Sequence, residues 1–257
     1  MFPKKLIQTY KFIDDVVKKS KNSFLHHNPD FSYEFFNDKK CNDFIRKHFG
    51  NDVIKAYLLI RPPAFKADLF RYCYLYKYGG IYSDIDTLCL QNLDILFDYN
   101  YDIIIARERR YIPGLYQGFV ICKPKLKLFK IAIERIVNNV KHQYYPPSFP
   151  DKWTEVLSIT GPVLLGNALC SILNRPDFNA HKITETNANN TLKIKFLTLK
   201  NDRIMDKDQS YIHTKIPEYK RKDPYYKYFI NKQVYNTVKK QIFYRSRLRR
   251  RRLRKRF

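Results

Sequence analysis

Two aspartates, Asp84 and Asp86, stand one residue apart at the end of a short apolar run that follows a pair of glycines. In an extended strand, side chains two positions apart point to the same face, so both carboxylates can aim at one object. Carboxylate oxygens suit Mg²⁺ or Mn²⁺, and such an ion keeps open positions for the phosphate oxygens of a substrate. The pair therefore indicates a cation site for a nucleotide diphosphate, although a bare Asp-x-Asp also occurs in ordinary solvated turns.

The segment before the aspartates is expected to form a helix over residues 64–78. Its apolar residues recur with the period of a helix. Two prolines precede it, and the paired glycines can end it through a positive φ. The helix would then reverse sharply into a strand over residues 81–83 that leads to Asp84.

Asp68 and Arg71 lie three positions apart on this helix, and therefore on one of its faces. Two interpretations stay open for them. They form a surface ion pair of little energetic weight, or they present a carboxylate and a guanidinium beside Asp84 and Asp86.

Strands and helices are expected to alternate along the chain, which favours an α/β fold built on a mostly parallel central sheet flanked by helices. Ligands of such sheets sit at the carboxyl ends of the strands, where Asp84 and Asp86 are placed. No element is predicted beyond about residue 205, where the periodicity is weak. The expected strands are 6–10, 31–35, 81–83, 101–106, 118–122 and 193–199, and the expected helices are 12–19, 38–49 (between Asn37 and Gly50 as caps), 64–78, 126–141 and 161–173.

The length of 257 residues suits one domain, taken as residues 1–244, and 44% hydrophobic residues exclude a disordered chain. No apolar run is long enough to cross a membrane, and the first residues do not resemble a signal peptide. Five scattered cysteines without a CxxC pair argue against a disulfide framework and a zinc site. A cytoplasmic protein is expected.

The chain carries 49 basic and 24 acidic residues, a net charge of +25, and many of the arginines lie in residues 245–257. This polybasic C-terminal tail has three open interpretations. It is a solvated tail, it holds the protein peripherally on an anionic membrane, or it follows the phosphates of a nucleic acid. Nucleic acid is the least favoured of these partners.

Several spaced motifs resemble one known family. Arg61, Asp68, Arg71 and Tyr72, followed by YGGIYSDID at residues 78–86, resemble the signature of glycosyltransferase family 32, the DXD sugar-binding group. That group includes fungal initiating α-1,6-mannosyltransferases and is related to the clostridial toxin glucosyltransferases. Three further blocks are similar to family blocks, and the resemblance covers roughly residues 2–170. These blocks are FPKKLIQTY at 2–10, the segment 28–38 and Thr160-Gly161-Pro162.

The resemblance implies a GT-A type nucleotide-sugar fold and a retaining, metal-dependent transfer of a sugar from a UDP- or GDP-sugar to an unidentified glycan, lipid or protein acceptor. By the same resemblance, Asp86 coordinates Mn²⁺ or Mg²⁺ directly. Asp84 contacts the ribose, sugar hydroxyls or metal-bound water. Arg71 holds the sugar ring and approaches the phosphates.

The remaining site residues follow from the same resemblance. Asp68 holds the sugar ring with Arg71, Tyr82 belongs to the donor-binding set, and Tyr10 stacks on the base unless it is merely an aromatic core residue. His213 is a candidate third metal ligand, or a structural histidine.

The chain departs from the family pattern in three places. Ile7 and Tyr10 replace the histidine and tryptophan of the opening block. Gln117 stands where an asparagine is usual before the second core strand. The C-terminal His-x-x-x-Ser-Trp block is reduced to a segment ending in His213, which leaves the third metal ligand undetermined.

Two other functions are weighed against this one. Asp84-Ile85-Asp86-Thr87 also spells the nucleophile motif of haloacid dehalogenase-type phosphatases, with Asp202 and Asp206 as that family's acidic metal motif. Such phosphatases normally place this motif on a strand at the start of the domain. Here a predicted helix that carries Asp68 and Arg71 precedes it. The second alternative is a basic nucleic-acid-binding protein that acts through its arginine tail.

Overall fold

The structure is a computed structural model that describes residues 1–108, 112–146, 149, 152–183, 187–188, 192–216, 228 and 231–236. The arginine tail from residue 245 and the predicted domain boundary before it lie outside the described residues. Among the residues described, no helix has the length and apolarity needed to cross a membrane. All five cysteines are buried and free.

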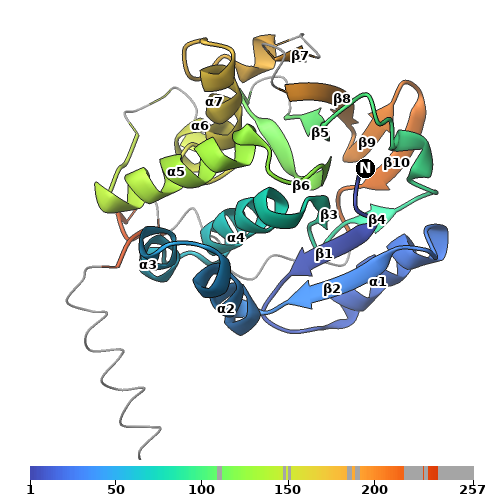
Figure 1. Cartoon of the computed structure of the whole chain (residues 1–257), viewed down its shortest axis with the longest axis horizontal. Coiled ribbons are helices and arrows are strands. Elements are labelled where there is room, and N and C mark those ends of the chain that lie inside the picture. Colours follow the sequence, from blue (N-terminus) through green and yellow to red (C-terminus); the bar gives the residue numbers. More distant parts are fainter. Residues whose placement is uncertain are drawn as a thin grey trace, which may run out of the picture.

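One ten-stranded sheet organises the molecule, in the order β2-β1-β3-β6-β5-β8-β9-β10-β4, with β7 paired to β8 (Figure 1). The α/β class predicted from the sequence is confirmed. The strands are β1 (Lys5–Thr9), β2 (Ser32–Phe36), β3 (Gly80–Ser83), β4 (Leu88–Cys89), β5 (Ile103–Arg107), β6 (Leu115–Cys122), β7 (Asn187–Ala188), β8 (Leu192–Lys200), β9 (Arg203–Asp206) and β10 (Gln209–His213). The helices are α1 (Asp15–His27), α2 (Asp38–His48), α3 (Asn51–Leu59), α4 (Pro63–Tyr78), α5 (Lys127–Lys141), α6 (Lys152–Leu157) and α7 (Pro162–Ile172), with short 3₁₀ turns at Asp94–Leu96 and Ala180–Lys182.

The prediction of a mostly parallel sheet is wrong. Parallel pairs join β1 to β2, β1 to β3 and β5 to β8, whereas the other pairings among the described strands are antiparallel. The central strand β6 runs against both of its neighbours, β3 and β5. No helix is described between β5 and β6, which follow one another along the chain, so the chain returns there in the opposite direction.

Both faces of the sheet are buried, because successive side chains of a strand point to opposite sides. Tyr82 and Ile105 belong to the larger cluster, under α2, α3, α4, α5 and α7. Their neighbours Ile81 and Ile104 belong to the smaller one, which packs against α1 and the segment 89–97. This explains why the strands read as continuous apolar runs rather than alternating ones.

Several element boundaries differ from the prediction. Asn37 caps α2 as expected, its side-chain oxygen accepting from Lys40 N at 2.9 Å. Gly50 does not end that helix but precedes α3, which was not predicted. The first helix begins at Asp15, and the side chain of Asp14 caps it by accepting a hydrogen bond from Val17 N. The β9–β10 hairpin was not predicted, because its two strands are short and contain several polar residues.

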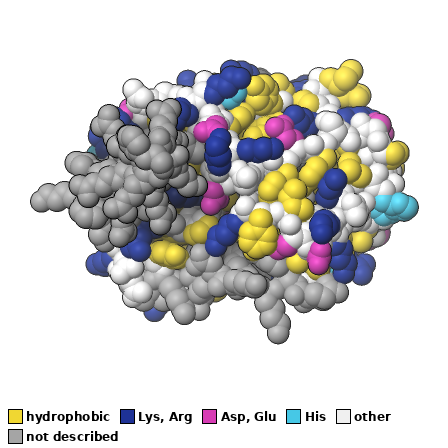
Figure 2. All heavy atoms as spheres, turned by 90° about the horizontal axis from the view of Figure 1, so that it is seen from below, with side chains coloured by type: hydrophobic (Ala, Val, Ile, Leu, Met, Phe, Trp, Pro, Cys, Tyr) yellow, Lys and Arg dark blue, Asp and Glu magenta, His cyan; other side chains and the backbone are white. Residues whose placement is uncertain are grey.

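Basic side chains of the described residues are scattered among acidic and apolar ones on the face seen in Figure 2. Many of them are paired there or elsewhere on the surface, as Lys4 is with Asp30 and Asp94 at 2.6 and 2.7 Å. The described residues form no separate basic stripe on that face.

Helix α4 ends at Gly79, whose φ of +64° and ψ of −152° suit glycine. A Cβ on this residue would lie 2.6 Å from the Cys122 carbonyl oxygen and 2.7 Å from Pro124 N. Neither backbone atom can move without shifting β6. The reversal from α4 into β3 therefore requires the absence of a side chain here.

We expect Gly79→Ala to lower the free energy of unfolding by about 1–3 kcal/mol or more, because it adds backbone strain to a steric clash. Urea denaturation measures the change. Gly50→Ala is the matched control, since nothing lies within 4 Å of its added Cβ. This variant should lower the free energy of unfolding by no more than about 1 kcal/mol, the usual contribution of a helix cap. Equal stabilities of the two variants would contradict this account of the turn.

Candidate active site

The turn after β3 is held firmly by its backbone. Asp84 N donates to the Gly118 carbonyl at 2.8 Å. The Asp84 carbonyl accepts from Gln8 Nε2 at 3.1 Å and from Thr87 Oγ1 at 2.7 Å. The side chains of Asp84 and Asp86 therefore extend from a firmly held stretch of backbone at the carboxyl end of β3.

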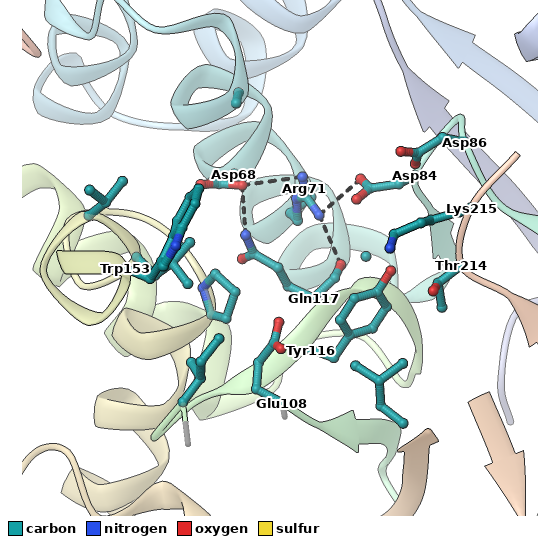
Figure 3. A pocket seen from close by; sticks show the side chains of 18 of the residues that line it. Asp68, Arg71, Asp84, Asp86, Glu108, Tyr116, Gln117, Trp153, Thr214 and Lys215 are labelled. Carbon is teal, nitrogen blue, oxygen red and sulfur yellow. Dashed lines mark hydrogen bonds and ion pairs between the residues drawn. The ribbon is translucent and has the colours of Figure 1, made fainter. Parts of the chain in front are cut away.

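Arg71 is the centre of the site. Its guanidinium lies 3.2 Å from Asp68 Oδ1 and 3.2 Å from Asp84 Oδ1, and it donates to the Gln117 carbonyl at 2.9 Å (Figure 3). Arg71 and Asp68 are only 5% and 6% exposed, so the interpretation as a surface ion pair is wrong. Burial disfavours the charged guanidinium, but Asp84, the Tyr82 hydroxyl and Asp68 outweigh it and raise the pKa of Arg71 above its usual value. Arg71 therefore stays charged.

Tyr82 connects the arginine to the first carboxylate. Its hydroxyl donates to Asp84 Oδ1 at 3.0 Å, and the Arg71 guanidinium stands 4.3 Å from the centre of its ring. Burial raises the pKa of Tyr82 well above its ordinary value, so the hydroxyl stays a donor. Asp84 is consequently oriented by two groups that come from different elements, α4 and β3.

The carboxylate of Asp68 is held from its other side. Gln117 Nε2 donates to its Oδ1 at 2.8 Å, and Thr160 Oγ1 donates to its Oδ2 at 2.7 Å. Tyr72 in turn donates to Gln117 Oε1 and lies 3.3 Å from the Gly161 carbonyl. Asp68 is therefore supported by Gln117, which departs from the family pattern, and by Thr160, which belongs to one of the blocks similar to the family.

Gly118 lets β6 approach the first aspartate closely. A Cβ here would lie 2.9 Å from Asp84 Oδ2 and 2.6 Å from the Tyr116 hydroxyl oxygen. Any other residue would displace one of these two side chains. The glycine thus keeps this carboxylate in its place.

These residues line a cavity of about 460 Å³ (Figure 3). A smaller cavity of about 150 Å³ shares Arg71, Asp84 and Asp86 with it and is lined on its far side by Tyr10 and Lys11. The aspartate pair therefore stands at the junction of two hollows, a larger one toward β6 and a smaller one toward the end of β1.

The structure brings together most of the predicted site residues. Asp68, Arg71, Asp84 and Asp86 line the larger cavity, and Tyr10 and Tyr82 line the smaller. His213 does not line either one; its Nδ1 accepts from Lys215 N at 3.3 Å.

Further lining residues were missed by the sequence reasoning. Thr214 and Lys215 follow directly after His213, in a region whose weak periodicity gave no signal. Trp153 and Glu108 also line the larger cavity, and only the rarity of tryptophan in this chain could have drawn attention to the first.

The acidic motif of the phosphatase alternative is split by the fold. Asp202 lines the larger cavity, whereas Asp206 on β9 pairs with Lys195 at 2.8 Å. Asp84, the nucleophile in that alternative, is already bound by Arg71 and Tyr82. The geometry does not favour a phosphatase.

The carboxylates suit a hard divalent cation. In the described ranges, no three His, Cys, Asp or Glu side chains gather closely enough to hold a metal ion by themselves. Mg²⁺ is commonly bound by one or two carboxylates together with substrate phosphates and water. Asp84 and Asp86 match that donor set, in which the substrate completes the coordination.

Comparisons with known proteins show similarity to glycosyltransferases. Residues 14–109 match the family described as a glycosyltransferase sugar-binding region containing a DXD motif. The chain is 34% identical over 125 residues to an initiation-specific alpha-1,6-mannosyltransferase of Candida albicans, covering 46% of this chain and 32% of the relative. It is 27% identical over 170 residues to a mannosyl phosphorylinositol ceramide synthase of Saccharomyces cerevisiae, covering 64% of this chain and 41% of the relative.

Among solved structures, the chain is similar to one titled PaToxG glycosyltransferase, with a TM-score of 0.48 and 15% identity over 67% of this chain and 70% of that one. That likeness is distant. The chain spans less than half the length of the two curated relatives named above. Residues 14–109, which include Asp68, Arg71, Asp84 and Asp86, thus match a glycosyltransferase sugar-binding region containing a DXD motif, the group that the spaced motifs resemble.

Proposed function

We propose that this chain transfers a hexose from a nucleoside diphosphate sugar to an acceptor hydroxyl, with a GT-A type arrangement and retention of the anomeric configuration. The observation that carries the proposal is the pair Asp84 and Asp86 at the junction of two cavities, with Asp84 fixed by Arg71. The site is built on a strand end and a helix, so its geometry is rigid.

The two cavities suggest how the donor lies. The nucleoside belongs to the smaller cavity, where Tyr10 offers a ring for the base. The diphosphate lies by Asp84 and Asp86, and the sugar ring extends into the larger cavity toward Asp68 and Arg71. This placement keeps the bond that breaks beside the charged groups.

Departure of the nucleoside diphosphate concentrates negative charge on its oxygens. Mn²⁺ or Mg²⁺ held by Asp86 and Asp84 would supply Lewis-acid neutralisation of that charge. Arg71 and Tyr82 hold the Asp84 carboxylate in a fixed orientation, so little reorganisation is needed when the charge develops. Lys215 lines the same cavity and adds a positive charge to it.

The named relatives suggest mannose as the first sugar to test. One is called an alpha-1,6-mannosyltransferase and another a mannosyl phosphorylinositol ceramide synthase. We therefore infer that GDP-mannose is the first donor candidate, and UDP-hexoses are the comparison. Release of nucleoside diphosphate from each donor, with and without Mn²⁺, tests the function directly. Absence of release from every nucleotide sugar, with and without an added polyol acceptor, would count against it.

The variant Asp86→Asn tests the cation site, because it removes the negative charge of the side chain but preserves its shape. We expect the metal-dependent part of nucleoside diphosphate binding to disappear in calorimetry, because an amide is a poorer ligand for a hard cation. Asp43→Asn on α2, which removes an exposed carboxylate paired with Lys39, is the control. Unchanged Mn²⁺ dependence in the Asp86 variant would show that this residue is not a ligand.

Arg71→Lys tests the central arginine. Lysine keeps the charge but cannot reach Asp68, Asp84 and the Gln117 carbonyl together, so donor hydrolysis should fall about a hundredfold through misplacement of Asp84. Arg135→Lys is the matched control, because Arg135 forms a two-point ion pair with Asp177 at 2.8 and 3.0 Å away from the cavity. Melting temperatures of both variants monitor the fold. Hydrolysis equal to the control's would refute the positioning role.

Lys215 is paired with Asp202 at 2.8 Å and is 58% exposed, so removing its charge should barely affect stability. We expect Lys215→Met to weaken nucleoside diphosphate binding about tenfold, the usual weight of a hydrogen bond to a charged group. Lys39→Met, which breaks a comparable exposed pair with Asp43 at 2.6 Å, should leave the affinity unchanged. Equal affinities in both variants would exclude Lys215 from the diphosphate site.

A further inference from the structure

The hydroxyl of Tyr116 differs from the other tyrosine hydroxyls of the site. Those of Tyr72 and Tyr82 donate to Gln117 and Asp84. Tyr116 also lines the larger cavity, but its hydroxyl makes no hydrogen bond to any residue that the structure describes. It therefore offers a hydrogen bond to a molecule that occupies the cavity.

An irregularity in β6 gives Tyr116 its position. Val120 pairs with Ile105 of β5, but the next pair along β5 joins Ala106 to Tyr116. Residues 117–119 of β6 therefore bulge out between these two pairs, and β5 has no residues to match them. Bulges of this kind recur beside active sites, where they redirect a side chain. The ring of Tyr116 packs against the smaller apolar cluster, so its hydroxyl end reaches the cavity from a fixed base.

The hydroxyl lies beside Asp84 without binding to it. A Cβ on Gly118 would lie 2.6 Å from the Tyr116 hydroxyl oxygen and 2.9 Å from Asp84 Oδ2, so both atoms border the same small space. Figure 3 shows the hydroxyl directed toward the side of the cavity that holds Asp84. Burial, and then the charges of Asp84, Asp86 and Glu108, raise the pKa of the hydroxyl well above its ordinary value, so all three carboxylates are near it. A tyrosine hydroxyl is protonated at neutral pH in any case, and it can donate.

We propose that Tyr116 is a catalytic residue whose hydroxyl donates a hydrogen bond to the diphosphate oxygen from which the sugar departs. This rests on the proposed function, which places the diphosphate beside Asp84 and Asp86. In the intact donor that oxygen bridges phosphorus and the anomeric carbon and carries no charge. It gains negative charge as its bond to the carbon breaks, and hydrogen bonds to ionised acceptors are roughly twice as strong as those to neutral ones. The contact therefore stabilises the transition state more than the bound donor.

The step is balanced without any further reactant. The oxygen of an acceptor hydroxyl, or of water in hydrolysis, forms a bond to the anomeric carbon while the bond from that carbon to the diphosphate oxygen breaks. The electron pair stays on the diphosphate oxygen, and the proton of the incoming hydroxyl passes to the diphosphate. Tyr116 keeps its own proton throughout and is unchanged after each turnover.

Tyr116→Phe removes only the hydroxyl and tests this role. We expect kcat for donor hydrolysis to fall about tenfold to a hundredfold, the usual effect of losing a hydrogen bond to a charged group. The KM for the donor should change by less than about twofold, because the bond strengthens only in the transition state. The Kd of nucleoside diphosphate with Mn²⁺ should rise about tenfold in calorimetry, since free diphosphate carries the charge that the donor lacks at this oxygen. Tyr99→Phe is the control, because Tyr99 is exposed and does not line the cavity.

Thermal stability distinguishes this role from a structural one. Because the hydroxyl has no hydrogen bond within the described part of the chain, Tyr116→Phe should not lower the melting temperature. Tyr33→Phe supplies the contrast, since the Tyr33 hydroxyl donates to Gln8 Oε1 at 3.2 Å and its loss should lower the melting temperature. A decrease in Tyr116→Phe as large as that in Tyr33→Phe would indicate a structural hydroxyl and overturn the assignment.

The outcomes separate the two proposals. If the wild-type chain hydrolyses no nucleotide sugar, the proposed function fails, and the affinities of wild type, Tyr116→Phe and Tyr99→Phe for nucleoside diphosphate still test the contact. If hydrolysis occurs but Tyr116→Phe keeps the kcat and the diphosphate affinity of the control, the assignment of Tyr116 alone is wrong. A donor KM raised as much as the Kd of the diphosphate would equally overturn it, because the hydroxyl would then bind both states alike.

Discussion

The site depends on one buried cation shared by two carboxylates. Arg71 joins Asp68 on its own helix to Asp84, which follows the next strand β3. Removing one partner of such a buried pair commonly costs about 3–5 kcal/mol, because the other charge is left uncompensated. The arrangement is therefore tolerable only while every partner is in place. This requirement links the helix α4, the strand β3 and the loop before α7 into one unit.

The supports of this unit come from distant parts of the chain. Gln117 on β6 and Thr160 before α7 bind Asp68, and Gly118 leaves space for Asp84. Burial keeps the hydroxyl of Tyr72 neutral, with a raised pKa, so that it can donate to Gln117. Arg71 Nε is buried without a hydrogen-bond partner among the described residues, but the other contacts of Arg71, Asp68 and Gln117 hold the network's members rigidly. Rigidity is what a site needs when a charge must develop between fixed groups.

Local patterns predicted the parts of the fold that local chemistry controls. The glycines after α4, the Asn37 cap and the spacing of Asp68 and Arg71 each have a short-range cause, and the structure places them as expected. Strand direction is not local, so the antiparallel position of β6 could not be read from its apolar run. Gly50 was assigned to the wrong helix because a glycine can end one helix or begin the next. Lys215 follows a hairpin of weak periodicity and gave no signal.

The contacts of Gln117 show what this side chain does in the site. Its amide donates to Asp68 while its carbonyl oxygen accepts from Tyr72, and its backbone carbonyl accepts from Arg71. The longer side chain thus bridges two buried groups on α4 that stand four positions apart, close to one helical turn. A shorter amide at this position could not reach both without a shift of β6. Since β6 also carries Gly118 against Asp84, such a shift would move the first carboxylate of the pair, so the choice at Gln117 is coupled to the position of the cation site.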